Sequence, residues 1–275
     1  MEKAYRFRKK LFFIFLKVLP KFLAVCVFLY LFLKIIQGDL MNKKLNICKR
    51  LLQCADLVTP QSRVADIGTD HAYLPIYLTL QNKISHAIAC DLRDEPLNIA
   101  KSNIKLFGLE DSIETRISDG LKNINQGEVD TIIIAGMGGN LISKILQECT
   151  WENKNQKEFI LQPMKYENVL RIYLAQQGYK IHQEVAVKCS GKVYTVLKAT
   201  FTSQPYTLSP LQIYTGFLSP AKNEDAKFYF LKILNDLNNR KKGAIIKNDE
   251  AQEQYYSKII EELNDILATQ KGDMK

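Results

Sequence analysis

The stretch Val64-Ala65-Asp66-Ile67-Gly68-Thr69-Asp70-His71 decides the fold of this 275-residue chain. It leads from a short apolar run, through an acidic turn that contains glycine, into the apolar segment 74–80. An apolar run, a glycine turn and a helical segment in this order are typical of a strand and helix in an α/β sheet. We therefore interpret 66–71 as the turn after the first strand. Gly68 has no side chain, so a ligand can approach the backbone closely there.

The residues that follow repeat this alternation of apolar runs and helical stretches. Strands that alternate with helices predict a parallel sheet with helices on both of its faces. We expect strands at 63–67, 86–90, 113–117, 131–135 and 159–161, and helices at 45–58, 74–80, 95–106, 140–148 and 167–176.

The last two expected strands, 180–187 and 192–201, are joined by Cys189-Ser190-Gly191, a turn that can form a hairpin. A doubly wound sheet that closes in an antiparallel hairpin is the architecture of class I methyltransferases, whereas nicotinamide-binding domains have two parallel halves. A dehydrogenase would also carry G-x-G-x-x-G at the first turn, where this chain reads D-I-G-T-D-H. The sequence thus predicts an α/β, Rossmann-like methyltransferase fold that uses S-adenosylmethionine.

Three further strand ends carry residues that fit this cofactor. Asp91 ends the second strand about 20 residues after Gly68, where a carboxylate can accept both ribose hydroxyls. Asp119 ends the third strand and suits the adenine amine of the cofactor. Each acid or glycine alone is also common as a helix cap or turn residue, but four sites at four successive strand ends favour cofactor binding. The expected cofactor-binding residues are Asp66, Gly68, Asp70, Asp91, Asp119, Gly120 and Gly136.

The fourth strand runs into Ala135-Gly136-Met137-Gly138-Gly139. This glycine-rich segment brings flexible backbone to the edge of the sheet where a methyl donor meets its acceptor. His71 lies in the cofactor loop beside Tyr73, and we expect it to contact the substrate base or the cofactor. The expected catalytic residues are therefore His71, Tyr73, Gly136, Met137 and Gly138.

The composition is that of a globular protein, with 47% hydrophobic and 24% charged residues, and it excludes disordered and fibrous classes. The net charge of +9 is compatible with a nucleic-acid partner but does not show one, because much of the excess lies in the first 40 residues. The six cysteines form no C-x-x-C pair, which predicts free thiols and no metal site.

Residues 1–40 differ from the rest of the chain in being basic and strongly apolar. The clean apolar run 22–33 is shorter than the roughly 20 residues that a membrane span needs. The segment is a membrane anchor, a cleaved signal, or an extension outside the natural protein, with translation beginning at Met41. We favour the extension, because 36–40 has no small-x-small cleavage site and Met41 is followed by a sequence typical of a bacterial protein start. Membrane contact is expected only if 1–40 is genuine.

The expected domains are a methyltransferase domain at 41–202 and a C-terminal part at 203–275. The latter begins with a linker that ends at Pro210. Apolar residues at helical spacing then predict a helical hairpin with its turn near Gly243.

The residues also resemble those of a known family, the bacterial tRNA (adenine(22)-N1)-methyltransferases. The motifs that carry the resemblance are V-A-D-I-G-T-D-H-A-Y-L-P at 64–75, A-G-M-G-G at 135–139 and L-Q-P at 161–163. It extends from about Met41 to Phe201, and more loosely through the C-terminal helices, which form a coiled-coil-like module in the family. The chain departs from the family pattern at Thr69, where serine is usual, and at Met164, where asparagine is common.

This resemblance implies methyl transfer to N1 of an adenine in the D-arm region of tRNA, by a cytoplasmic enzyme. The N1 atom lies on the Watson–Crick edge, so the base must leave its stack, and the tRNA must dock on the protein. Alternatives are a methyltransferase that acts on another RNA base or on protein, and a non-catalytic protein that binds the cofactor or RNA. A monomer is favoured. The expected substrate contacts are Gly139, Gln162, Pro163, Lys43, Lys44, Arg240, Lys241 and Lys242.

Overall fold

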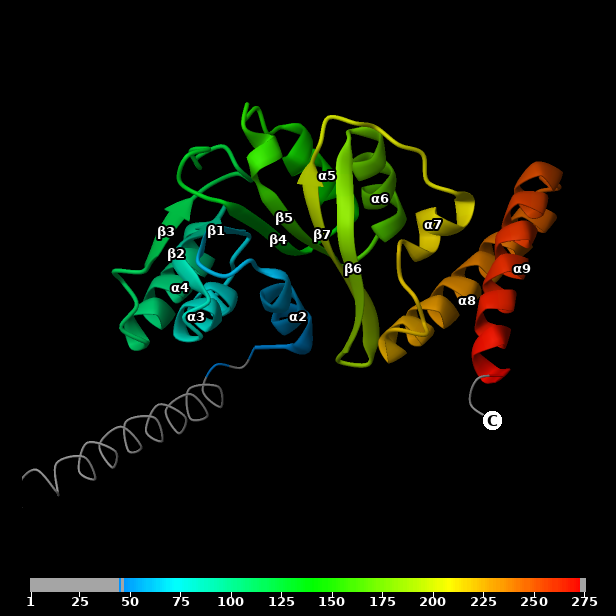
Figure 1. Cartoon of the computed structure of the whole chain (residues 1–275), viewed down its shortest axis with the longest axis horizontal. Coiled ribbons are helices and arrows are strands. Elements are labelled where there is room, and N and C mark those ends of the chain that lie inside the picture. The colour runs from blue at the N-terminus through cyan, green and yellow to red at the C-terminus, as the bar shows by residue number, and fades with distance from the viewer. Residues whose placement is uncertain (1–44, 46, 273–275) are drawn as a thin grey trace, which may run out of the picture. The chain divides into compact units, whose positions relative to one another are not determined.

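The computed structural model describes residue 45 and residues 47–272 (Figure 1). The chain divides into two compact units, 1–46 and 47–275, and the description below concerns the second. The predictions for 1–40, and those for Lys43 and Lys44, lie outside the described residues.

A seven-stranded sheet with the order β3-β2-β1-β4-β5-β7-β6 forms the centre of this unit (Figure 1). The first five strands pair in parallel, and β7 pairs antiparallel with both β5 and β6. This topology confirms the predicted methyltransferase fold and its closing hairpin. The strands are β1 (Ser62–Ile67), β2 (Ile84–Asp91), β3 (Ile113–Ile117), β4 (Thr131–Met137), β5 (Glu158–Pro163), β6 (Tyr179–Cys189) and β7 (Lys192–Phe201).

Helices cover both faces of the sheet. Three neighbouring helices, α2 (Lys49–Leu57), α3 (Tyr73–Leu80) and α4 (Asp94–Leu106), form one group, and α5 (Gly139–Gln147) and α6 (Glu167–Gln176) form the other. Ile132, Ile133 and Ile134 of β4 are each 0% exposed, although successive residues of a strand point to opposite faces. Burial on both faces explains why these strands are continuous apolar runs in the sequence.

The strand register brings the predicted turns to one edge of the sheet. Ile67 of β1 pairs with Cys90 of β2 and with Ile134 of β4, while Asp91 pairs with Ile117 of β3. Four strands therefore end at nearly the same level, and the turns that follow them lie close together.

The C-terminal part is a helical pair, α8 (Glu224–Ile246) and α9 (Glu250–Gly272), as predicted. The turn lies at 247–249 and not at Gly243, which is inside α8, because Asn248 supplies the left-handed backbone (φ 55°) that ends the helix. A short helix that we did not predict, α7 (Pro210–Thr215), starts at the end of the expected linker, with a capping box between Ser209 and Gln212.

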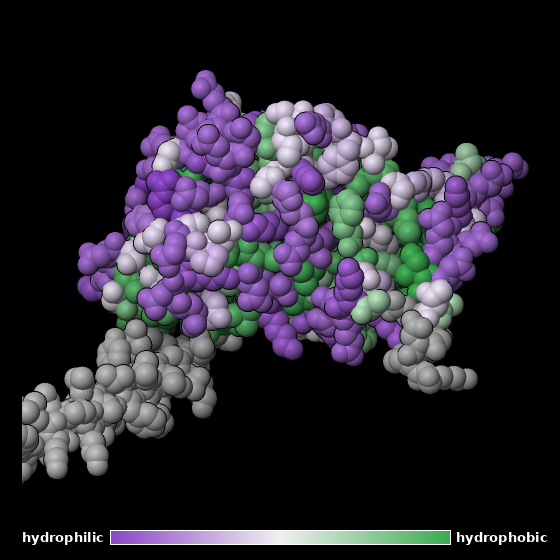
Figure 2. Space-filling view, in the orientation of Figure 1, coloured by the Kyte–Doolittle hydropathy of each residue, from purple (hydrophilic) through white to green (hydrophobic). Residues whose placement is uncertain are grey.

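The helical pair packs on the β6–β7 hairpin through a core of its own. Ala186 of β6 and Val193 of β7 share this core with apolar residues of α8 and α9. Figure 2 shows hydrophobic residues where α7, α8 and α9 meet. The domain boundary at 202 stays a prediction. Among the described residues, no helix combines the length and the apolar character that crossing a bilayer requires.

Candidate cofactor and methyl-transfer site

A hollow of about 450 Å³ opens at the edge of the sheet where β1, β2 and β4 end. The structure brings together here most of the residues expected at the site. The predicted residues that line the hollow are Asp66, Gly68, Asp70, His71, Tyr73, Asp91, Asp119, Gly120, Gly136 and Met137.

The first turn is shaped by Gly68 and anchored to the neighbouring strand. The backbone N–H groups of Gly68 and Thr69 both donate to the carbonyl of Cys90, at 2.9 and 2.8 Å. Gly68 has φ +73°, and a Cβ at this position would overlap the terminal methyl of Met137. The positive φ favours glycine at this position, and a larger residue would also displace the flexible end of the Met137 side chain.

His71 is held by a strained loop. Asp70 and Ala72, which flank it, have φ values of 57° and 58°, a region that residues other than glycine rarely adopt. The Asn103 side chain donates to the His71 carbonyl at 3.0 Å, which ties the loop to α4. The His71 ring packs edge-on against Tyr73 with ring centroids 5.5 Å apart. Both aromatic side chains therefore have defined positions at the hollow.

Asp66 is a buried carboxyl group at the floor of the site. Its Oδ2 accepts a hydrogen bond of 2.7 Å from the Thr69 hydroxyl. Burial raises the pKa of the Asp66 carboxyl to about 6; the Thr69 hydrogen bond and nearby Arg50 counteract part of this effect. Because this pKa lies close to neutrality, a charged ligand beside Asp66 changes the fraction of the carboxyl that is ionised.

Asp91 and Asp119 have different environments. Asp91 Oδ1 accepts from the backbone N–H of Arg93 at 3.1 Å, which orients its carboxylate at the rim. Asp119 is exposed and forms an ion pair with Lys122, and this hydrogen bond lowers the pKa of Asp119. If Asp119 bound the adenine amine of the cofactor, its carboxylate would therefore contact both the amine and Lys122.

Arg50 is a residue of the cofactor site that was not predicted from the sequence. It lines the hollow from α2 and donates from Nη1 to Oε1 of Gln162. The same oxygen accepts from the backbone N–H of Gly136 at 3.0 Å, so Gln162 links the guanidinium to the glycine-rich loop. A basic residue at the start of the helix that precedes the first strand is the only local sign of this role. The hydrogen-bond partner of Arg50, Gln162, lies 112 residues away in the sequence.

Several expected residues lie outside the hollow. Gln162 and Pro163 are buried, and Gln162 supports Arg50 and Gly136. Gly138 immediately precedes α5. Gly139 is buried, and it packs so closely against the carbonyl of Tyr166 that a Cβ at this position would overlap it. The basic residues Arg240, Lys241 and Lys242 lie on α8, and of these Arg240 lines a separate groove.

The sheet topology and the acids that meet at its strand ends define a class I, S-adenosylmethionine-dependent methyltransferase. Residues 47–197 match the family model described as a methyltransferase domain. The chain is 36% identical over 190 residues to the tRNA (adenine(22)-N(1))-methyltransferase of Bacillus subtilis, an alignment that covers 69% of this chain and 80% of that protein. It therefore belongs to the family of tRNA (adenine(22)-N1)-methyltransferases.

Solved structures agree with this assignment. The crystal structure of the B. subtilis m1A22 tRNA methyltransferase TrmK is 32% identical with a TM-score of 0.69, and the match covers 81% of this chain and 99% of that one. M. capricolum TrmK, solved with the cofactor product S-adenosylhomocysteine, is 28% identical with a TM-score of 0.68, over 80% of this chain and 99% of that one.

Proposed function

We propose that this chain transfers the methyl group of S-adenosylmethionine to N1 of adenine 22 in tRNA. The observation that carries the proposal is the convergence of Asp66, Asp91 and the Gly136–Met137 loop on one hollow, in a chain of this family. tRNA is then the macromolecular partner, and we propose that the enzyme works in the cytoplasm as a monomer.

The charged groups of the hollow match the amino-acid end of the donor. We assign the donor carboxylate to Arg50, whose planar guanidinium can bind a carboxylate through two parallel hydrogen bonds. We assign the donor ammonium to Asp66 and the ribose hydroxyls to Asp91. Opposite charges at the floor of the hollow thus fix the orientation of the donor.

The chemistry requires alignment more than proton transfer. The bound donor supplies an electrophilic methyl group, and N1 of neutral adenine has an in-plane lone pair, so no proton has to be removed first. The protein has to hold the two atoms in line and exclude water. We assign positioning of the adenine to His71 and Tyr73, whose loop is fixed by Asn103.

Donor binding is expected to depend on pH through Asp66. Because the pKa of Asp66 in the free protein is about 6, its carboxyl is largely protonated at pH 5 and ionised at pH 7. The donor ammonium favours the ionised form, so affinity should rise about tenfold per pH unit below pH 6 and level off above it. Calorimetric titration with S-adenosylhomocysteine from pH 5 to 8 measures this. Asp66→Asn should remove the pH dependence of the affinity. If the pH profile of this variant matched that of the wild type, a group other than Asp66 would cause the dependence.

The function is tested with the purified full-length chain, labelled donor and three acceptors: unmodified tRNA, DNA and a protein mixture. Nucleoside mass spectrometry should detect 1-methyladenosine in the tRNA alone. Label in protein, or a different methylated nucleoside in the tRNA, would refute the proposed acceptor.

A further inference from the structure

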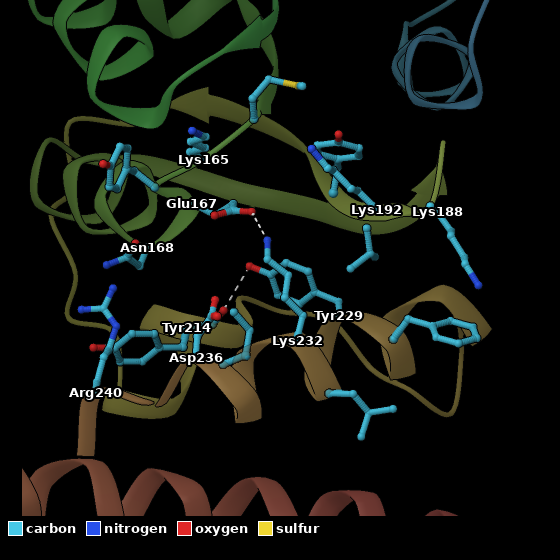
Figure 3. Close-up of a pocket in the computed structure, with 18 residues that line it drawn as sticks. Lys165, Glu167, Asn168, Lys188, Lys192, Tyr214, Tyr229, Lys232, Asp236 and Arg240 are labelled. Atoms are coloured by element: carbon cyan, nitrogen blue, oxygen red, sulfur yellow. Dashed lines mark hydrogen bonds and ion pairs between the residues drawn. The ribbon is translucent and has the colours of Figure 1, made fainter. Parts of the chain in front are cut away.

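A second and larger cavity, of about 890 Å³, lies outside the site described above. It is a groove between the β5–α6 loop, the tip of the β6–β7 hairpin and α8 (Figure 3). The hairpin tip is fixed against α8, because the backbone N–H of Lys188 donates to Asp225 at 2.8 Å. The groove is therefore bounded by elements that hold one another in place.

The charge of the groove favours an anion. Five cationic side chains line it, against the two carboxylates of Glu167 and Asp236. Lys232 pairs with Glu167 at 2.9 Å, as the dashed line in Figure 3 shows. The other four cations, Lys165, Lys188, Lys192 and Arg240, are exposed and come from the loop, the hairpin and α8.

Exposed aromatic rings line the groove together with these cations. Phe228 is 41% exposed and has the ammonium of Lys188 3.9 Å from its ring centroid. Tyr166 is 54% exposed and adopts a left-handed backbone (φ 61°) at the start of α6. Cations that bind phosphates, interleaved with exposed rings on which bases stack, are typical of a surface that binds unpaired RNA.

The groove begins where the methyl-transfer site ends. The backbone N–H of Met164 donates to the carbonyl of Met137 at 2.7 Å, and Gly139 donates to that of Lys165 at 2.8 Å. The loop that lines the start of the groove is thus bonded to the loop that lines the hollow. A base extruded into the hollow would leave its neighbouring nucleotides at the groove.

We propose that this groove binds the strand of the tRNA that flanks the target adenine. Lys165, Lys188, Lys192 and Arg240 contact its phosphates, and Tyr166 and Phe228 stack on its bases. The inference rests on the proposed function for the identity of the RNA, but the groove itself is tested by binding.

The test compares two double variants of the full-length chain that carry the same change in charge. Lys188→Glu/Lys192→Glu alters the groove, and Lys101→Glu/Lys105→Glu alters exposed positions of α4 that line neither cavity. Equilibrium binding of unmodified tRNA is measured over a range of salt concentrations, with S-adenosylhomocysteine affinity as the control for folding.

The groove variant should bind tRNA at least tenfold more weakly than the α4 variant. Its affinity should also depend less on salt: the slope of log affinity against log salt concentration should be shallower by about 0.7 to 0.9 for each lysine removed. Tyr166→Ala should weaken binding on the order of tenfold, and Tyr166→Phe, which keeps the ring, should restore it. Affinity for S-adenosylhomocysteine should stay that of the wild type in all of them.

The outcomes separate the groove from the proposed function. If both double variants bind tRNA equally well, or the wild type does not bind it, the groove assignment is overturned. If the wild type binds tRNA through the groove yet forms no 1-methyladenosine, the proposed function fails and the groove assignment stands.

Discussion

Replacing Arg50 with alanine is expected to weaken the binding of S-adenosylhomocysteine by roughly 30- to 150-fold. Truncation of one partner in a desolvated, hydrogen-bonded charge pair costs about 2–3 kcal/mol or more, and every 1.4 kcal/mol is a factor of ten. The loss should be confined to ligands that carry the amino-acid carboxylate. 5′-Methylthioadenosine lacks that group, so its affinity for Arg50→Ala should equal that for the wild type. Isothermal titration of both ligands measures the difference.

The neighbouring residue provides a matched control. Lys49 is exposed on the same helix and does not line the hollow, so Lys49→Ala should bind both ligands normally. Arg50→Lys should lie between the wild type and alanine, because an ammonium keeps the charge but not the two parallel hydrogen bonds. Equal losses for both ligands in Arg50→Ala would show that Arg50 supports the shape of the pocket through Gln162, and that it does not bind the donor carboxylate.

The second large effect is expected at Arg171, in a fully buried ion pair that joins α6 to β6. The side chains of Arg171 and Glu184 are both 0% exposed, and Nη2 of Arg171 lies 2.6 Å from Oε1 of Glu184. Arg171 also donates to the carbonyls of Ile213 and Tyr214 in α7 and to the hydroxyl of Tyr229 in α8. This network connects the C-terminal helices to the sheet.

Arg171→Ala should lower the free energy of unfolding by about 3–5 kcal/mol, because Glu184 remains buried without its partner. Thermal and urea unfolding measure the loss. The double variant Arg171→Met/Glu184→Leu removes both charges and should be clearly more stable than Arg171→Ala. If the single variant lost less than about 1 kcal/mol, the pair would not be the structural link that its burial indicates.

The sequence predicted those features that follow from local pattern. Continuous apolar strands, the turn at Gly68 and the acid of Asp91 are local signals, and parallel pairing necessarily brings successive strand ends to one edge. The closing hairpin was predicted in the same way from the turn at 189–191, whereas the order of the strands came from the structure. The C-terminal helical pair was predicted from its periodicity, but its turn was misplaced because an isolated glycine such as Gly243 is tolerated inside a helix.

Features that depend on distant residues could not be predicted. The contact of Arg50 with Gln162 joins positions 112 residues apart, and neither residue alone indicates it. The left-handed conformations of Asp70 and Ala72 depend on the packing around them and leave no mark in the sequence. Lys188 and Lys192 resemble ordinary surface lysines until the hairpin places them in the groove that Arg240 also lines (Figure 3).

The central claim is the site of methylation, and position mapping tests it most directly. An unmodified tRNA transcript with adenine at position 22, and a matched transcript with guanine there, are incubated with the purified chain and S-adenosylmethionine. Digestion to oligonucleotides and mass spectrometry should place one methyl group on N1 of adenine 22 in the first transcript and none in the second. Equal methylation of both transcripts, or a methyl group at another position, would contradict the account.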